Sequence, residues 1–285
     1  MPALGNMPTS DQPTNGGPAG DRAERVLPLK GLKAQARIVW ALLLREIITR
    51  FGRRNIGFLW LFVEPAMFVI VITAIWTATH DLHRSQIPIA AFTLTGYTSM
   101  LMWRNTPSRC IGALSSNQSL LYHRQVTMLD IYLARIILEF AGVTTSFMVL
   151  GLLMWMGGWL EPPENVLQVI GGWGLLAWFG MALALTLGPL SERYPAVQKL
   201  WSPIAILLFI LSGTSFLLDT FPPTVRYWLL WLPMTSGLEY LREGFFGSQF
   251  KAHYDLEYMC TATMVLMLFG LTQVRRVALN ETIIA

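Results

Sequence analysis

The chain has 285 residues, of which 53% are hydrophobic and only 13% are charged, with a formal net charge of +4. So few charged side chains cannot cover a soluble globule of this length, which excludes the common soluble folds. Its two cysteines, Cys110 and Cys260, lie far apart in or beside apolar segments, which excludes a disulfide framework and a metal-site spacing. The composition therefore predicts an all-α membrane protein.

Residues 1–30 combine prolines and glycines with polar side chains and contain no apolar block. We predict a disordered cytoplasmic tail without a cleavable signal peptide, because such a segment cannot bury enough apolar surface to fold. Residues 31–56 place apolar and cationic side chains at a spacing close to helical, which predicts an amphipathic interfacial helix. Its basic residues include Arg37, Arg45, Arg50, Arg53 and Arg54.

Residues 57–285 form the predicted transmembrane domain, with six apolar blocks near or above the ~17–25 residues that a helix needs to cross hydrocarbon. The predicted spans are 57–79, 87–107, 131–157, 167–189, 200–217 and 257–274. Between the last two spans, two apolar stretches too short to cross are separated at Pro233. They predict a pair of re-entrant or periplasmic helices, the second capped by Thr235 or Ser236.

The distribution of positive charge predicts the orientation of these spans. With the N-terminus inside, most Lys and Arg residues fall in the inner segments 1–56, 108–129, 190–199 and 275–285. The reversed topology would place this positive excess outside. We therefore predict a multi-pass inner-membrane protein whose two termini are both cytoplasmic.

Charged residues within the spans have both functional and structural interpretations. Glu64 precedes Pro65 in the first span, where it either lines a polar cavity or is hydrogen bonded at a proline kink. Arg135 and Glu139 are four residues apart on the third span, which favours a structural ion pair between them.

The fourth span carries a stripe of small residues at Gly180, Ala184 and Gly188. Small side chains allow helices to approach closely, and we expect the stripe to pack within the subunit rather than across a dimer. The tryptophans also have two interpretations. Most are expected to form belts at the two membrane interfaces, and a subset facing a cavity would provide stacking surfaces for sugar rings.

The sequence contains no Walker A phosphate loop, no zinc-protease motif and no nucleophile elbow. These absences disfavour an enzyme, and they require any ATP-driven activity to use a separate ATPase. The cytoplasmic segment 108–129 fits that interpretation, because motion from a partner ATPase has to enter through a protruding loop.

Four segments in fixed order carry a family resemblance: LLREIITRFGR, GFLWLFVEP, NQSLLYHRQV and LPMTSGLEYLREGFF. Over residues 33–280 the chain resembles the membrane subunit of a type-2 ABC exporter, and most of all the capsular-polysaccharide export permeases of Gram-negative bacteria. The resemblance implies a homodimer with two cytoplasmic ATPase subunits, which bind ATP and Mg. It also implies export of a lipid-linked polysaccharide towards a periplasmic adaptor or copolymerase and an outer-membrane exporter, with no cofactor in this chain and no nucleic-acid partner.

The resemblance also assigns candidate roles to individual residues. Those expected to contact the substrate or its lipid anchor are Arg45, Arg50, Arg53, Arg54, Trp60, Glu64, Tyr97 and Trp103. Those expected to couple to the ATPase are Ser119, Leu120, Leu121, Tyr122 and His123. Those expected at the periplasmic exit are Trp228, Trp231, Glu239 and Arg242. Leu232 stands where the family usually has Asn before the proline of the helix pair, which argues against a side-chain cap at that position.

Two other functions remain possible from the residues alone. An O-antigen or teichoic-acid exporter of the same architecture would differ in its ATPase partner, which often carries a carbohydrate-binding domain. A membrane glycosyltransferase or acyltransferase would need catalytic carboxylates or histidines grouped at one membrane face. Glu161 and Glu164 are the only close acidic pair in a short outer loop, and no further catalytic group accompanies them.

Overall fold

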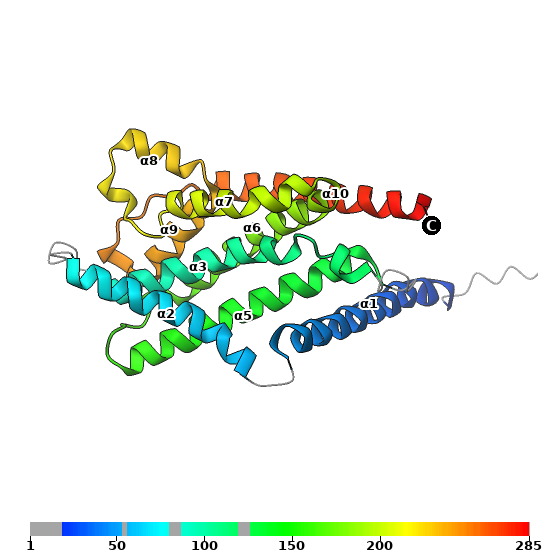
Figure 1. The fold of residues 1–285 in the computed structure, drawn as a ribbon, viewed down its shortest axis with the longest axis horizontal. Helices are drawn as coiled ribbons and strands as arrows, with labels where there is room; N and C mark the ends of the chain where they lie inside the picture. The colour runs from blue at the N-terminus through cyan, green and yellow to red at the C-terminus, as the bar shows by residue number, and fades with distance from the viewer. Residues whose placement is uncertain (1–18, 53–55, 80–86, 119–125, 285) are drawn as a thin grey trace, which may run out of the picture.

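The protein is helical throughout the residues that its computed structural model describes, with no strand among residues 19–52, 56–79, 87–118 and 126–284. The long helices are α1 (Ala19–Phe51), α2 (Ile56–Thr79), α3 (Ile89–Cys110), α5 (Met128–Met156), α6 (Val166–Arg193), α7 (Pro195–Leu211) and α10 (Leu256–Ile284). The shorter elements are α8 (Pro223–Leu230), α9 (Pro233–Phe246) and 3-10 turns at Ser115–Asn117, Leu218–Thr220 and Gly247–Gln249. Figure 1 shows the long helices running roughly along one common axis.

Three of these helices are long and apolar enough to cross a membrane, judged by length and composition over the described residues. They comprise Met128–Met156, Val166–Arg193 and Leu256–Leu279, which correspond to the predicted third, fourth and sixth spans. Helices α2, α3 and α7 occupy the positions of the other three predicted spans. The all-helical membrane fold is therefore confirmed in outline, and the six-span count stays a prediction.

Helix α1 differs in its bounds from the predicted interfacial helix. It begins at Ala19, so residues 19–30 belong to a helix and not to the predicted disordered tail. It ends at Phe51 rather than at residue 56, because Gly52 adopts a positive φ of 67° and its N–H is bonded to the carbonyl of Ile48. Residues 1–18 lie outside the described part of the chain.

The predicted break between two short helices at Pro233 is confirmed, because α8 ends at Leu230 and α9 begins at Pro233. The predicted cap is wrong. Thr235 and Ser236 lie inside α9 and are fully buried, and Leu232 occupies the N-cap position with no side-chain hydrogen bond. Proline at the first helical position makes such a cap less necessary, since one of the unpaired N–H groups is absent there.

Helix α6 lies at the centre of the bundle, packed against α3, α9 and α10. The small-residue stripe allows this close packing. A Cβ atom on Gly180 would lie 3.0 Å from the carbonyl oxygen of Met102, and one on Gly188 would lie 2.6 Å from the ring of Tyr132. Packing of the stripe within the subunit is therefore confirmed.

Two glycines on α6 provide a matched test of this packing. A Cβ on Gly172 would lie 2.8 Å from the Cβ and 2.9 Å from the Cα of Leu241, whereas one on Gly174 would meet nothing within 4 Å. We expect Gly172→Ala to destabilise the protein by about 1–3 kcal/mol through overpacking. Gly174→Ala should stabilise it by up to about 1 kcal/mol, through helix propensity. Thermal unfolding of the two purified variants checks this, and equal shifts in Tm would contradict it.

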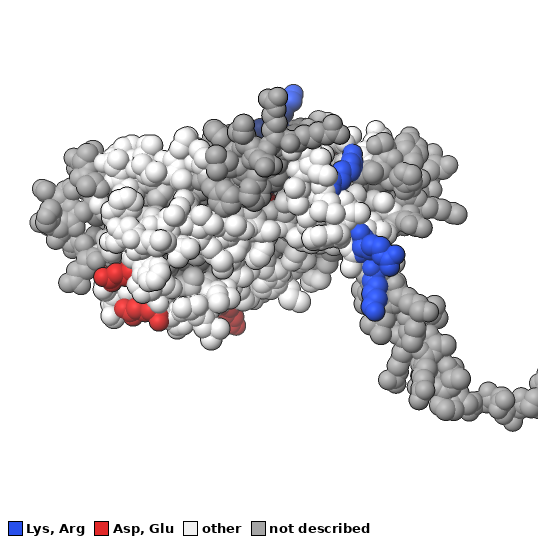
Figure 2. Space-filling view, turned by 90° about the horizontal axis from the view of Figure 1, so that it is seen from below, with Lys and Arg blue, Asp and Glu red and all other residues white. Residues whose placement is uncertain are grey.

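The two ends of the bundle differ in charge. The start of α1 and the C-terminal end of α10 lie at one end, and α8 and α9 lie at the other (Figure 1). On the face drawn in Figure 2, Lys and Arg gather towards the first end and Asp and Glu towards the second. We call these the basic end and the acidic end.

Candidate functional site

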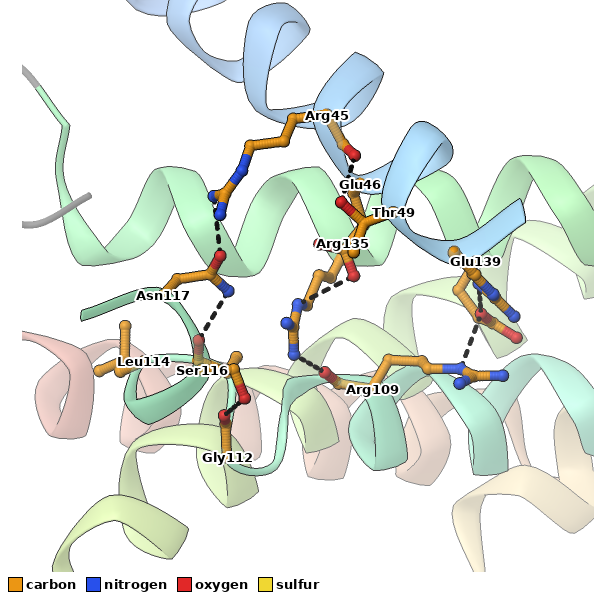
Figure 3. Close-up of polar contacts among 12 residues, drawn as sticks. Arg45, Glu46, Thr49, Arg109, Gly112, Leu114, Ser116, Asn117, Arg135 and Glu139 are labelled. Atoms are coloured by element: carbon orange, nitrogen blue, oxygen red, sulfur yellow. Dashed lines mark hydrogen bonds and ion pairs between the residues drawn. The ribbon is translucent and has the colours of Figure 1, made fainter. Parts of the chain in front are cut away.

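A buried carboxylate joins α1 to the bundle at the basic end (Figure 3). The Arg50 guanidinium donates to Glu139 Oε2 at 2.6 Å, and Arg109 Nε lies 3.6 Å from the same oxygen. Glu139 is only 2% exposed, so water cannot replace these partners. One carboxylate on α5 therefore ties together α1 and α3, and it needs the positive charges to offset its desolvation.

A second ion pair joins the same helices. Arg135 on α5 lies with Nε 3.3 Å from Glu46 Oε1 on α1, and it donates through its terminal nitrogen to the backbone carbonyl of Arg109 at 2.6 Å. The predicted pairing of Arg135 with Glu139 is wrong. The two are neighbours on α5, but the docking of α1 gives each of them a closer partner on another helix (Figure 3).

Helix α1 contacts the chain on both sides of residues 119–125. Before this segment, Arg45 donates to the side-chain oxygen of Asn117 at 2.9 Å. After it, the Gln35 amide donates to Asp130, which also closes a capping box with Thr127 at the start of α5. Both flanks of the segment are therefore fixed to one helix.

The turn that leads into this segment is also fixed to the end of α6. Glu192 Oε1 accepts the backbone N–H of Leu114 at 3.0 Å and that of Ser115 at 3.3 Å. Gly112, with φ +67°, donates its N–H to the hydroxyl of Ser191 at 3.2 Å. Helices α1, α5 and α6 therefore hold the two ends of the loop in place. The predicted coupling residues Ser119, Leu120, Leu121, Tyr122 and His123 lie outside the described residues, and their docking role stays a prediction.

The structure describes the side chains of only four of the eight predicted substrate residues, namely Arg45, Arg50, Tyr97 and Trp103. Arg53 and Arg54 lie outside the described residues, and so do the side chains of Trp60 and Glu64. Tyr97 stacks on Phe68 with ring centroids 3.8 Å apart and is 5% exposed. Trp103 is 2% exposed and packs in the core. Trp103 is thus enclosed by protein, whereas Tyr97 borders a small cavity of about 20 Å³ that Phe68 and Phe92 also line.

The predicted exit residues divide into two groups. Trp228 and Trp231 on α8 and the adjoining turn are 66% and 55% exposed, with ring centroids 6.3 Å apart. Glu239 and Arg242 on α9 are 1% and 0% exposed. The aromatic pair is thus available to a ligand or to the membrane, whereas the charged pair is enclosed by protein.

Arg242 holds the end of α7. Its guanidinium donates to the carbonyls of Gly213 at 2.7 Å and Thr214 at 2.9 Å, and it lies 3.7 Å from the ring centroid of Phe92. Both carbonyls lie in the turn just beyond the end of α7, and the buried guanidinium provides the hydrogen-bond donors that they need. Glu239 in turn accepts the backbone N–H of His253 at 3.1 Å.

A polar cluster at the acidic end surrounds Asp219. His253 Nε2 lies 2.9 Å from its carboxylate, and Arg226 and Lys251 lie 3.4 Å and 3.5 Å away. The hydrogen bond from His253, followed by the charge of Lys251, holds the pKa of Asp219 below its usual value. A cluster of this kind links the chain before α8 to the chain after α9.

Sequence reasoning missed several residues of these networks. Glu46 and Asn117 pair with groups far away in the chain, and so does Asp219 with Lys251 and His253, and no local pattern indicates such partners. Asp130 did carry a signal, because Thr127 and Asp130 have the spacing of a capping box.

Comparison with known proteins agrees with this architecture. Residues 37–246 match the ABC-2 type transporter family. The chain is 40% identical over 247 residues to the capsule polysaccharide export inner-membrane protein CtrC of Neisseria meningitidis serogroup B, covering 87% of this chain and 93% of that protein. It is 37% identical to BexB of Haemophilus influenzae, a protein of the same description, over 86% of this chain and 93% of that one.

A more distant relative is the polysialic acid transport protein KpsM of Escherichia coli, 29% identical over 247 residues, with 86% of this chain and 95% of that protein covered. The family match spans most of the described helices, from α1 to α9. The chain therefore belongs to the ABC-2 type transporter family of membrane proteins.

Proposed function

We propose that this chain is the permease subunit of an ATP-driven exporter that moves lipid-linked capsular polysaccharide across the inner membrane. The observation that carries the proposal is the 40% identity to CtrC, which extends over 93% of that capsule polysaccharide export protein. Similarity over 87% of this chain supports the same arrangement of helices and loops in the two proteins. An anionic polymer is a suitable cargo, since the relative from Escherichia coli is a polysialic acid transport protein.

In the proposed assembly two copies of the chain form the channel, with α2, α3, α5, α6, α7 and α10 as the six spans. The basic end faces the cytoplasm, because positive side chains near a span are retained on the inner side. Both termini are then cytoplasmic, and α8 and α9 form the re-entrant or periplasmic pair. The separation of charge between the two ends supports this orientation (Figure 2).

ATP and Mg are bound by two partner ATPase subunits in this proposal, because the chain contains no phosphate-loop sequence. The segment 119–125 docks on the ATPase. Helix α1 contacts both flanks of that segment through Arg45 and Gln35, so movement of the segment would also move α1. The interfacial helix is thereby coupled to the ATPase as well as to the bundle.

The outward path continues past the exposed Trp228 and Trp231, whose rings offer stacking faces to sugars. Many weak contacts of this kind would allow a polymer to slide. Beyond α8 the polymer passes to a periplasmic adaptor or copolymerase and an outer-membrane exporter. The arginines of α1, namely Arg45, Arg50, Arg53 and Arg54, are proposed to attract the anionic end of the substrate to the inner headgroup region.

A genetic experiment tests the proposal. Deleting the gene in its native host should abolish surface capsule and leave lipid-linked polymer inside the cell, and the parent chain supplied in trans should restore export. Cell-surface and intracellular polymer are measured with the same glycan-specific antibody before and after permeabilisation. A deletion strain that lacks polymer altogether would indicate a role in synthesis, and one with normal surface capsule would exclude the proposed substrate.

A further inference from the structure

A polar cleft of about 470 Å³ lies between α3 and α7 at the basic end. Its walls come from the second half of α3, with Arg104, Ser108 and Arg109, and from the first half of α7, with Gln198 and Trp201. The two walls are joined on one side by the Trp201 indole N–H, which donates to the Ser108 hydroxyl at 2.7 Å. Arg109 connects this cleft to the contacts between α1 and α5, because its Nε lies 3.6 Å from Glu139.

Arg104 has the positive charge in this cleft that is least engaged by protein. Its hydrogen bond is to the side chain of the adjacent Asn105 at 3.4 Å, and within the described residues no carboxylate lies within ion-pair distance of it. The contact of Arg109 with Glu139 is long, with 3.6 Å between Nε and Oε2, and the Arg109 side chain is 49% exposed. By contrast, Arg50 is held at 2.6 Å by the same carboxylate. Two arginines therefore line a cleft whose described lining contains no acidic side chain.

The cleft changes from polar to apolar along its length. Arg104, Ser108 and Gln198 offer hydrogen-bond donors, whereas Ala205 and Ile206 line the part further into α7. Ile206 is 54% exposed, and Leu207 and Ile210 continue an exposed apolar face along α7. A ligand that fits both parts has an anionic group at the arginines and an alkyl chain along the helix. Arginine provides planar paired donors that match the oxygens of a phosphate.

From this geometry we propose that the cleft between α3 and α7 binds a phosphate ester carried on a lipid, with Arg104 as its principal ligand and Arg109 as a second donor. The lipid is either the anchor of the exported polymer or a membrane phospholipid, which present the same chemistry. Gln198 and Trp201 form the rim beside the phosphate. Binding of a lipid phosphate in this cleft does not depend on the protein being a transporter. Only the identification of that lipid as the anchor of the exported polymer rests on the proposed function.

Binding is tested on the purified full-length chain with dioctanoyl phosphatidic acid as the probe. Arg104→Gln should weaken binding by about tenfold or more, because it removes a charge-assisted pair of hydrogen bonds. Gln198→Glu is a second variant at an exposed position, where the side chain makes a long hydrogen bond of 3.4 Å to the Ser191 carbonyl, and its carboxylate should repel the phosphate with a similar loss. Arg276→Gln, an exposed arginine on α10, is the matched control and should bind like the parent.

Four results would overturn the proposal, and the first three concern the variants and the uncharged lipid. They are parental affinity in both cleft variants, an equal loss of affinity in Arg276→Gln, and binding of dioctanoylglycerol, which lacks the phosphate, as tight as that of the probe. Inorganic phosphate that competes as well as the lipid would also exclude a lipid site.

Capsule export by a strain that carries Arg104→Gln then shows whether the bound lipid is the anchor of the exported polymer or a membrane phospholipid. Loss of export with the chain still in the membrane identifies the anchor of the substrate. Normal export together with lost binding identifies a phospholipid site. A parent chain that fails to restore capsule would refute the proposed function and leave the binding result standing.

Discussion

Replacing Arg242 with methionine should destabilise the protein by about 3–5 kcal/mol, the typical effect of removing one member of a buried charged network. The side chain is fully buried and donates to the carbonyls of Gly213 and Thr214, which follow the end of α7. Methionine fills similar space but leaves these acceptors without a donor, and each buried unsatisfied group is costly. It also leaves Glu239, three residues earlier on α9, without its neighbouring positive charge.

Thermal unfolding of the detergent-purified variants measures this effect. Arg242→Lys should lie between methionine and the parent, because lysine keeps the charge but cannot reach several carbonyls with a planar fork. Arg276→Met, the same change at an exposed site on α10, is the control and should leave Tm within a degree or two of the parent, about the shift expected for a surface substitution. An unchanged Tm in Arg242→Met would show that the clamp on α7 contributes nothing to stability.

Glu139→Gln should release α1 from the bundle and abolish most export. Glutamine has nearly the same shape, but it removes the negative charge that Arg50 contacts at 2.6 Å and Arg109 contacts at 3.6 Å. Two guanidinium groups would then share a buried neutral amide. The loss of one member of this network is expected to cost about 3–5 kcal/mol. Surface capsule and the sensitivity of α1 to limited proteolysis measure the outcome.

A double-mutant cycle separates the ion pair from a general loss of packing. Arg50→Gln combined with Glu139→Gln should be less damaging than the sum of the two single changes, with a coupling of about 1–3 kcal/mol. Glu161→Gln, in an exposed loop at the acidic end, is the matched control and should export normally. Strict additivity of the two single variants would show that the carboxylate and Arg50 do not stabilise each other.

Helices with a strong apolar pattern were predictable from local sequence. The predicted span 57–79 is observed as Ile56–Thr79, and 167–189 is observed as Val166–Arg193. The prediction for α7 was displaced, at 200–217 against Pro195–Leu211, because apolarity alone located it. Pro195 at its first turn and Gly213 with φ +76° just beyond its end are the local signals that mark its true limits.

The candidate site was less predictable, because its contacts join helices that are distant in the chain. The spacing of Arg135 and Glu139 favoured a local pair, whereas α1 supplies Arg50 to Glu139 and Glu46 to Arg135. The other differences between the predicted and the observed site arise from residues that the structure buries. Arg242 and Glu239 were predicted to shape an exit, yet the structure encloses both of them, and no sequence pattern distinguishes a helix face towards a channel from one towards a neighbouring helix.

Reconstituted transport tests the central claim most directly. The purified chain and its ATPase partner are placed in proteoliposomes, with lipid-linked capsular polymer in the leaflet that faces the ATPase. Addition of ATP and Mg should move the polymer into the lumen, where a glycan-degrading enzyme outside cannot reach it. Omitting this chain or ATP should leave the polymer accessible. Polymer that stays accessible with the complete complex, or becomes protected equally well without this chain, would contradict the assignment of this protein as the exporting permease.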